Sequence, residues 1–495
     1  MGDAAATAQS AWIAAGLAAH REGDHERAAR LYDTVLESDP QNADALHLRG
    51  ALAMQQGDLD RAHELIARAI AQRPANAAFH SNQAIVCRRL GRLDEAVGHA
   101  REALILNEAT PQIHRVLGQC LAEAGDMSAA LQAYSRANHL DRSHRPSIDA
   151  ELDCLMALGR YPAVLARISA FDLEPDDGIR FRQAQALRAL GKHDEAWNTL
   201  QDCGDHKTLL WQLNALKHRL ECGDEAAAID HGQIVLKLKE RLALERRGAP
   251  AVAQTEAWPE RAGEFRPGDE ANPDRNLVCF SLWGAKPKYT INAVRNAERV
   301  PRLYPGWRAC FYVDESVPED IRTRLAGLGA KIVLIQDDDP RHVLKAFWRF
   351  FAGAEPGVER FLCRDCDALV NEREAAAVAQ WVDSGRLFHV MRDHPEHAEL
   401  IMAGMWGGVG GLLRDLSGEA LHYYHNYTPR WHWMDQDFLR DCVWPLIRHH
   451  CLVHDDRYRM GACTRPFPPV TLPKGAHVGG YFPEDDPGAV SRGTD

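Results

Sequence analysis

Small residues recur at a fixed spacing among the apolar and polar positions of the first 240 residues. Glycine returns every 34 residues and then twice at intervals of 32, at Gly23, Gly57, Gly91, Gly125, Gly159, Gly191 and Gly223. A small residue also recurs five positions after these glycines, with Val164 as the exception, at Ala28, Ala62, Ala96, Ala130 and Ala196. A fixed period of this length is typical of stacked helical pairs, and small side chains let two antiparallel helices approach closely. The pattern therefore predicts an all-helical repeat array.

A second register of small residues accompanies the first. It comprises Gly16, Gly50, Ala84 and Gly118, and Pro40 and Pro74 end the first two units. These positions resemble the tetratricopeptide repeat, a helix-turn-helix unit of 34 residues, over roughly residues 8–240, which implies about six or seven units. Stacked units leave a concave surface, which in this family holds peptides or extended protein segments. We expect the array to recruit a protein or peptide; the alternative is that it only dimerises or braces a second domain.

The helical period stops near residue 240. Residues 241–275 collect Pro250, Pro259, Pro267 and Pro273, a composition typical of a linker. Eight of the twelve tryptophans follow, between Asn276 and the C-terminus, so a different kind of domain begins there. We predict three parts: a repeat domain over 1–240, a linker over 241–275 and a second domain over 276–495.

The second domain alternates apolar and polar stretches. Strands are predicted over 277–283, 307–313 and 331–335, and helices over 286–299 and 318–328. This alternation predicts an α/β domain with a mostly parallel sheet. A further helix over 341–353 precedes an apolar strand over 359–370, which contains Asp365 and Asp367 near its carboxyl end. Ligands of open α/β sheets bind at that end of the strands.

Composition limits the possible partners. The 495 residues carry a formal charge of −12, so nothing attracts the chain to nucleic acid or to an anionic membrane. No run approaches the roughly 18 apolar residues of a membrane-spanning helix, and the N-terminus carries no export or lipid signal. Twelve dispersed cysteines fit reduced thiols. We expect a cytoplasmic protein of open oligomeric state.

The Asp365-Cys366-Asp367 segment is the main chemical candidate. Carboxylates at positions i and i+2 of a strand share one face and can reach one cation. Such a pair suits Mg²⁺ or Mn²⁺, which prefers oxygen ligands and keeps positions open for phosphate oxygens. The cation would act as a Lewis acid on a departing diphosphate.

A later segment, Met434-Asp435-Gln436-Asp437-Phe438-Leu439, completes a pattern with these acids. Together the two segments resemble the nucleotide-sugar glycosyltransferases of the GT-A fold, in particular family 8, over roughly residues 276–485. The resemblance implies a nucleotide-sugar donor, with uridine diphosphate sugars favoured, and a histidine as third metal ligand. His477 in Ala476-His477-Val478-Gly479-Gly480 is the best match and His454 is the competitor. The lysine-proline-tryptophan tail of the family does not follow His477.

Further residues are candidates for donor binding. Arg349 could contact the diphosphate bidentately, or could be a surface arginine over aromatic neighbours. Arg364 and Asp365 stand beside the same site. Trp406, in a glycine-rich segment, could stack on a sugar or fill the core. We interpret Lys288, after the first strand, as an exposed loop residue.

The acceptor side has two candidate bases. Asp393 and Asp435 could each deprotonate the acceptor hydroxyl in an inverting enzyme. In a retaining enzyme, Asp435 and Gln436 would instead be positioning groups. The resemblance to family 8 favours retention.

Two rival hypotheses use the same chain. A zinc or thiol enzyme would use Cys363-Arg364-Asp365-Cys366, Asp393-His394-Pro395-Glu396-His397 or His449-His450-Cys451, although a closed zinc site needs four ligands. A repeat scaffold with an inactive transferase-like domain would only bind partners. We predict a metal-dependent glycosyltransferase whose repeats recruit a protein or peptide acceptor, or a partner in an envelope polysaccharide pathway.

Overall fold

The computed structural model describes residues 2–171, 176–247, 255, 258–264, 272, 274–426, 434–473 and 476–480. The chain divides into two compact units, Met1–Gly204 and Asp205–Asp495. No helix among the described residues is long and apolar enough to cross a membrane.

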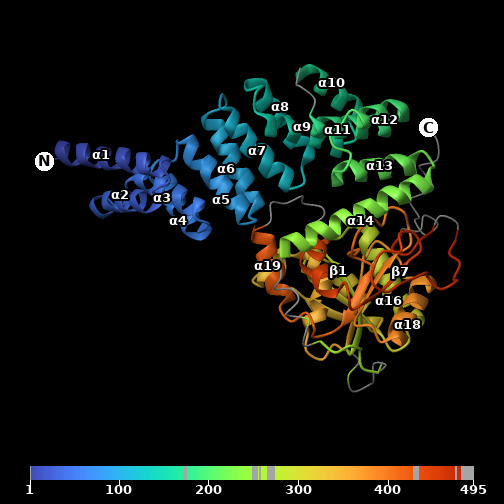
Figure 1. Ribbon diagram of the computed structural model, residues 1–495. Helices are drawn as coiled ribbons and strands as arrows, with labels where there is room; N and C mark the ends of the chain where they lie inside the picture. Colours follow the sequence, from blue (N-terminus) through green and yellow to red (C-terminus); the bar gives the residue numbers. More distant parts are fainter. Residues whose placement is uncertain are drawn as a thin grey trace. The chain divides into compact units, whose positions relative to one another are not determined.

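The first unit is a series of antiparallel helical pairs (Figure 1). Its helices are α1 (Gly2–Arg21), α2 (His25–Ser38), α3 (Ala43–Gln55), α4 (Leu59–Gln72), α5 (Ala77–Arg89), α6 (Leu93–Leu106), α7 (Pro111–Glu123), α8 (Met127–Leu140), α9 (Arg145–Ala157), α10 (Tyr161–Phe171), α11 (Asp177–Ala189) and α12 (His193–Gln201). Each pair also contacts the next, so the array is continuous. The helical repeat predicted from the glycine spacing is confirmed.

The turn inside each pair explains the recurring glycine. Gly57 has φ 85°, a conformation that glycine adopts without steric cost. The next residue, Asp58, caps α4 by accepting a hydrogen bond from the Arg61 backbone N–H at 3.2 Å. The second register of small residues serves packing, since a Cβ on Gly118 would lie 2.9 Å from the Tyr134 ring.

A seventh helical pair belongs to the second unit. It consists of α13 (Leu209–Glu221) and α14 (Glu225–Arg247). The sequence places these helices in the repeat domain and begins the linker at 241, whereas α14 continues to Arg247 and packs with the sheet. Sequence period and packing thus assign this pair to different parts of the molecule.

Specific contacts attach α14 to the rest of the second unit. Lys239, which is 3% exposed, donates a hydrogen bond to the Ala398 carbonyl at 2.9 Å and pairs with Glu399. The indole N–H of Trp444 donates to Glu240 at 3.1 Å. A buried lysine with these partners ties the helix to the segment that follows β5.

The second unit is built on a mixed eight-stranded sheet. The strand order is β3-β2-β1-β4-β6-β5-β7-β8. The strands are β1 (Asn276–Leu282), β2 (Arg308–Val313), β3 (Lys331–Leu334), β4 (Arg360–Arg364), β5 (Phe388–Arg392), β6 (Trp406–Val409), β7 (Cys451–Asp455) and β8 (Thr464–Arg465). Only β6 is antiparallel to its neighbours among these strands, with Leu362 of β4 opposite Gly407. The predicted mostly parallel α/β sheet agrees with this arrangement.

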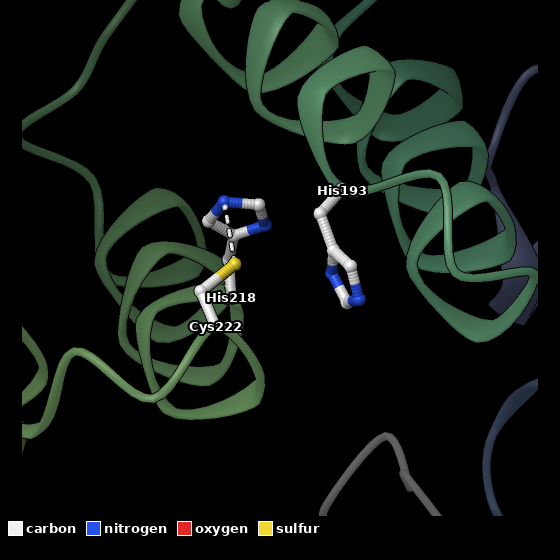
Figure 2. Close-up of side chains that lie close together, drawn as sticks. All are labelled: His193, His218 and Cys222. Carbon is white, nitrogen blue, oxygen red and sulfur yellow. Dashed lines mark hydrogen bonds between the residues drawn. The ribbon is translucent and has the colours of Figure 1, made fainter.

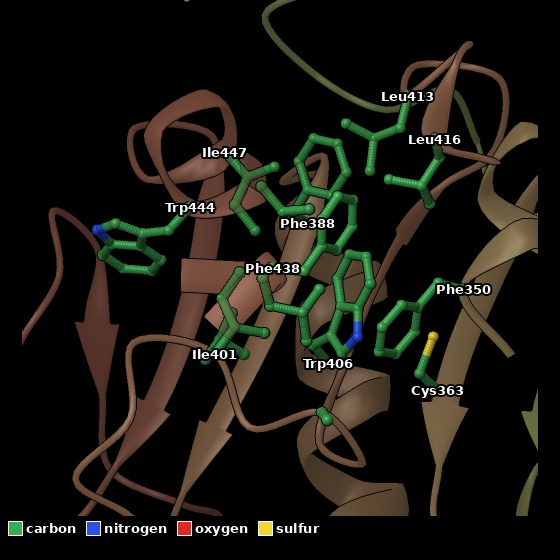
Figure 3. Packing of buried hydrophobic residues seen from close by; sticks show 14 of the residues in the cluster. Phe350, Cys363, Phe388, Ile401, Trp406, Leu413, Leu416, Phe438, Trp444 and Ile447 are labelled. Carbon is green, nitrogen blue, oxygen red and sulfur yellow. The ribbon is translucent and has the colours of Figure 1, made fainter. Parts of the chain in front are cut away.

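Helices cover both faces of the sheet. One face, with Val278 and Phe280, packs against α16 (Pro287–Leu303), α17 (Glu319–Gly327) and α18 (Glu372–Ser384). The other face packs against α14 and the later elements α19 (Leu416–Asn426), α20 (Met434–Phe438), η3 (Leu439–Val443) and α21 (Trp444–Ile447). Aromatic and branched side chains fill this second layer (Figure 3).

The helix expected over 341–353 is tighter than an α-helix. It forms two 3₁₀ segments, η1 (Pro340–Val343) and η2 (Lys345–Ala354), which are separated at Leu344. Every residue from 347 to 353 is buried, so no polar face alternates with an apolar one. The segment lies in the core beside β1 and β4 and does not form a surface helix.

The strand order reverses between β1 and β4, because β1 leads outward to β2 and β3 whereas β4 lies on its other side. The carboxyl ends of β1 and β4 point to the same edge, since the two strands are parallel. Open α/β sheets bind ligands in the crevice at such a reversal. The candidate acids follow β4 at this edge.

Candidate functional site

The two acids lie on a turn. The strand ends at Arg364, and Asp365 and Asp367 follow it, so the argument from alternating strand faces does not apply to them. Helix α16 holds the turn in place: Asn292 and Asn296 donate side-chain hydrogen bonds to its backbone carbonyls at 3.1 and 2.9 Å. The carboxylates are thereby presented at the edge of the sheet.

Arg349 connects the two sequence motifs. Its guanidinium lies 3.0 Å from Asp365 Oδ1 and 3.1 Å from Asp435 Oδ2, and the residue is 5% exposed. It also donates to the Ala403 carbonyl at 3.3 Å. Burial lowers the pKa of Arg349, but the two carboxylates raise it by more, and the net pKa lies above its usual value. Burial raises the pKa of Asp435.

The segment 401–405 forms the base of this cluster. Gln436 accepts a hydrogen bond from the Ala403 backbone N–H at 2.8 Å and donates to the Ile401 carbonyl. A Cβ on Gly404 would overlap the Asp365 carboxylate, so a larger residue there would displace that side chain. Gln436 therefore positions the segment on which Asp365 and Arg349 rest.

Asp367 has its own cation. Lys288, at the start of α16, lies 2.9 Å from Asp367 Oδ2 and is 53% exposed. The lysine interpreted as an exposed loop residue thus reaches the acid turn. The carboxylate side chains of Asp365 and Asp367 are 43% and 33% exposed. Each of the two acids is thus paired with a cation and partly open to solvent.

His477 belongs to a different group of side chains. Its imidazole lies with Asp393 and His397, and one ligand atom from each residue falls within 4.8 Å of the others. Among the described residues, His477 does not form such a group with Asp365 and Asp367. The structure therefore brings two of the three metal ligands expected by resemblance to one turn and places the third beside the candidate base.

The competing histidine is a core residue. His454 on β7 is fully buried and lies 2.8 Å from His389 and 3.0 Å from Gln380. Burial lowers the pKa of His454 to about 4. Both of its ring nitrogens are thus engaged by neighbouring side chains.

Two donor-binding candidates are structural. Arg364 is 3% exposed and donates to Glu374 at 2.8 Å and to the Trp406 carbonyl at 3.3 Å. Trp406 is fully buried and lies against Phe350 (Figure 3), with ring centroids 5.6 Å apart. The Phe361 ring centroid is 5.2 Å away. The core alternative therefore describes the position of Trp406, and both side chains are buried in the structure.

Other residues at this edge of the sheet are not predicted from the sequence. Arg392 and Asp455 form a fully buried pair at 2.9 Å, and they hold the loops after β5 and β7. Trp283 follows β1 directly and is 41% exposed. No local signal marks the Arg392 and Asp455 pair, because 63 residues separate the partners.

The cysteines do not support a thiol site. Cys363 and Cys366 are buried in different core layers, and burial raises the pKa of both thiols. Directly after α13, Cys222 Sγ lies 3.6 Å from His218 Nε2, four residues earlier in the chain (Figure 2). His193, also drawn there, begins α12 and belongs to the first unit. The α13 pair alone offers two ligands, too few for a closed zinc site.

Comparison with known proteins identifies the first unit. Residues 19–85 and 99–143 match tetratricopeptide repeat models. Solved structures with similarity include PilF of Pseudomonas aeruginosa (20% identity, TM-score 0.33, covering 48% of this chain and 93% of that one) and a tetratricopeptide repeat protein from Parabacteroides merdae (16%, 0.35, 47% and 93%). MamA is also similar (19%, 0.29, 36% and 96%). A search of curated proteins found no match. The family models thus support tetratricopeptide repeats in the N-terminal region, over residues 19–85 and 99–143.

Proposed function

We propose that the second unit binds a nucleoside diphosphate sugar at the carboxyl ends of β1 and β4 and transfers the sugar to an acceptor. The observation that carries this proposal is Arg349, which joins Asp365 and Asp435 at the point where the strand order reverses. Sequence motifs 70 residues apart (435 minus 365) meet there around one buried cation. Two partly exposed acids and two cations at this position favour a diphosphate that is bound together with a divalent ion.

Each side chain has a separate task in this proposal. Asp365 and Asp367 would hold Mg²⁺ or Mn²⁺, which stabilises the negative charge of the leaving diphosphate. Lys288 lies on the exposed side of Asp367 and can turn to a phosphate oxygen. Trp283 offers an exposed aromatic face beside the same strand end for stacking on a base or sugar.

Asp435 is the acceptor-side group that this geometry favours. It lies against Arg349 beside Asp365, whereas Asp393 faces the histidines. Its carboxylate would orient the acceptor hydroxyl, as a base in an inverting reaction or as a positioning group in a retaining one. Gln436 holds the segment 401–405 in place.

The repeats would supply the acceptor. A tetratricopeptide array presents a concave surface that suits an extended segment of a partner protein. The acceptor in this proposal is a protein or peptide, or a polysaccharide precursor carried by a partner protein. Tethering raises the local concentration of acceptor without any new contact at the transfer site.

The test is calorimetric binding of uridine and guanosine diphosphates to the full chain, with and without Mn²⁺. We expect Mn²⁺-dependent binding that weakens by about tenfold or more, equal to about 1.4 kcal/mol, in Asp367→Ala. Asp338→Ala is the matched control, since Asp338 is exposed and lies outside the site. Equal binding by the two variants, or no binding by the wild-type protein, would refute the donor site.

A second function is favoured by one observation. Arg349 and Lys288 already neutralise the two acids, as in a site that has no need of a metal ion. In that case the protein is a repeat scaffold whose second unit only binds partners. Absence of nucleotide binding in both metal conditions, together with saturable binding of a defined partner peptide by the full chain, would favour this alternative.

A further inference from the structure

A buried carboxylate oxygen near the end of β5 has no hydrogen-bond donor. Asp393 is 6% exposed, and its Oδ1 accepts no hydrogen bond within the described part of the chain. Its other oxygen is well held, since Oδ2 accepts from the Val478 backbone N–H at 2.8 Å. A buried carboxylate oxygen without a partner is costly, so this atom calls for a ligand.

Two imidazoles face that oxygen. His397 Nδ1 lies 3.6 Å and His477 Nδ1 lies 4.0 Å from Asp393 Oδ1. His394 stacks on His477 with ring centroids 4.5 Å apart and an interplanar angle of 24°. His394 and His397 come from the loop after β5, and His477 comes from the segment 476–480. The cluster therefore brings these two parts of the chain together.

The ring nitrogens nearest Asp393 Oδ1 already have contacts of their own. His477 Nδ1 lies 3.1 Å from the Val478 carbonyl oxygen, and the Asp393 backbone N–H donates to His397 Nδ1 at 3.4 Å. A metal ion would replace such contacts, coordinate the rings and offset the cost of the buried carboxylate.

The spacing is close to that of a metal site. In a tetrahedral zinc site with bonds of about 2.0–2.2 Å, neighbouring ligand atoms lie about 3.4 Å apart. The separations of 3.6 and 4.0 Å from Asp393 Oδ1 exceed this by about 0.2 and 0.6 Å, and the three ligand atoms all lie within 4.8 Å of one another. We propose that Asp393, His397 and His477 bind one divalent transition-metal ion of the Zn²⁺ class, at a site separate from Asp365 and Asp367.

The surrounding groups orient these ligands. The Val478 N–H fixes Asp393 Oδ2 and leaves Oδ1 directed at the rings. Arg373, 3.7 Å from Oδ2, stands behind the carboxylate, and the Arg392 and Asp455 pair holds the loop that carries His397. Such supporting contacts set the orientation of metal ligands in proteins.

A cavity lies beside two of the three ligands. A hollow of about 490 Å³ is lined by Asp393 and His477, together with His394, Arg373 and Arg457, and His397 is not among its lining residues. Three protein ligands with an open position are typical of a reactive zinc site, whereas structural sites are closed by four. Water or an anionic group would complete the coordination. The site needs no nucleotide and goes beyond the transfer reaction proposed above.

The experiment measures metal binding by the full chain without nucleotide. The protein is stripped with a chelator and titrated with Zn²⁺ against a chromophoric competitor, and Co²⁺ is used as a second probe through its visible absorption. We expect one Zn²⁺ per chain and a loss of affinity of about tenfold or more in Asp393→Asn and in His397→Ala. Asp365→Asn, which alters the acid turn, and His449→Ala, at an exposed position, are the controls and should keep the ion.

Two outcomes would overturn the proposal. One is a wild-type chain that takes up no Zn²⁺ or Co²⁺ in competition with the chromophore. The other is loss of the ion in Asp365→Asn with retention in His397→Ala, which would place His477 with the acid turn. Circular dichroism checks folding, and His397→Gln, which keeps a polar side chain, replaces His397→Ala if that variant unfolds. Because no nucleotide is present, failure here leaves the donor-site test unaffected.

Discussion

The two units differ in how their cores are made. In the repeat array, the buried positions near each turn are small, as with Ala62 and Ala96, and their partners lie within the same or the next helical pair. In the second unit, Trp406, Phe361 and Phe388 pack across strands that are distant in sequence. Loss of one contact in the array should therefore destabilise only the helices near it. The sheet instead depends on contacts between residues that are far apart in the chain. A repeating period in the sequence predicts the first core, and no such period predicts the second.

The pair α13 and α14 stands between these two kinds of core. Gly223 continues the repeat series and has the same positive φ, 77°, as the earlier turn glycines. Yet Val235 and Leu236 of α14 belong to the hydrophobic core beneath the sheet. Ten of the twelve tryptophans lie in the second unit, so tryptophan fluorescence mainly follows the unfolding of that unit, and helical circular dichroism follows the array as well.

Removing the central aromatic of the sheet should have the largest effect. Trp406→Ala should lower the free energy of unfolding of the second unit by about 3–5 kcal/mol, because it leaves a cavity between Phe350 and Phe361. Denaturant titration followed by tryptophan fluorescence measures this loss. Hydrogen exchange in α1–α8 should be unchanged, and faster exchange there would show that the two cores are coupled.

The assignment of α14 to the second unit can be tested at the buried Lys239. Lys239→Met should lower the free energy of unfolding by about 1.5–3 kcal/mol, because it removes the bonds to Ala398 and Glu399. Hydrogen exchange should rise in α14 and near residue 399 together. Lys237→Met, two positions away on the same helix, is the control. Increased exchange in α11 and α12 without change near 399 would assign α14 to the array after all.

A methyl group should disturb the array only locally. Gly118→Ala places a Cβ 2.9 Å from the Tyr134 ring and should cost about 1–3 kcal/mol, with faster exchange confined to α7, α8 and their neighbours. The matched variant is Gly98→Ala, in α6, where a Cβ meets nothing within 4 Å. That change should stabilise the array by about 0.4–1 kcal/mol. Equal effects of the two substitutions would contradict the packing role of the second glycine register.

Acidification should lower the free energy of unfolding of the second unit, whereas no such loss is expected at neutral pH. Burial lowers the pKa of His389 well below its usual value and that of His454 to about 4. Between about pH 6.5 and 4, the unfolded chain binds protons that these folded histidines reject. Stability is therefore full above pH 6.5 and falls by up to about 1.4 kcal/mol per pH unit for each group.

Fluorescence-monitored unfolding at several pH values measures that slope. His389→Gln should reduce it, whereas His449→Gln, at an exposed position, should leave it unchanged. An unchanged slope in His389→Gln would exclude this histidine as its source.

Sequence patterns located much of the fold. The predicted strands over 277–283 and 331–335 lie within one residue of β1 and β3 at each end. The strand predicted over 359–370 is longer than β4. Residues 365–370 follow the strand as a turn and a segment without regular structure, and α16 holds them by hydrogen bonds. Apolar side chains such as Leu369 and Val370 are buried there without a strand, and an apolar run cannot distinguish the two cases.

The candidate site was only partly accessible from sequence. The resemblance of two segments to a known family brought Asp365 and Asp435 into one hypothesis, and in the structure both contact Arg349. The partner of His477 could not be found in the same way. Asp393 lies 84 positions away (477 minus 393), and the two meet only because β5 ends at the edge that the segment 476–480 crosses.

The sequence by itself determined the helical pairs, their turns and the alternation of strands and helices, because these depend on residues close together in the chain. Tertiary structure alone decided that α14 packs beneath the sheet, that Trp406 fills the core and that Lys288 reaches Asp367. It also decided that Asp393, His397 and His477 meet. These outcomes depend on strand order and on which side chains share a buried layer, and no local spacing records either of them.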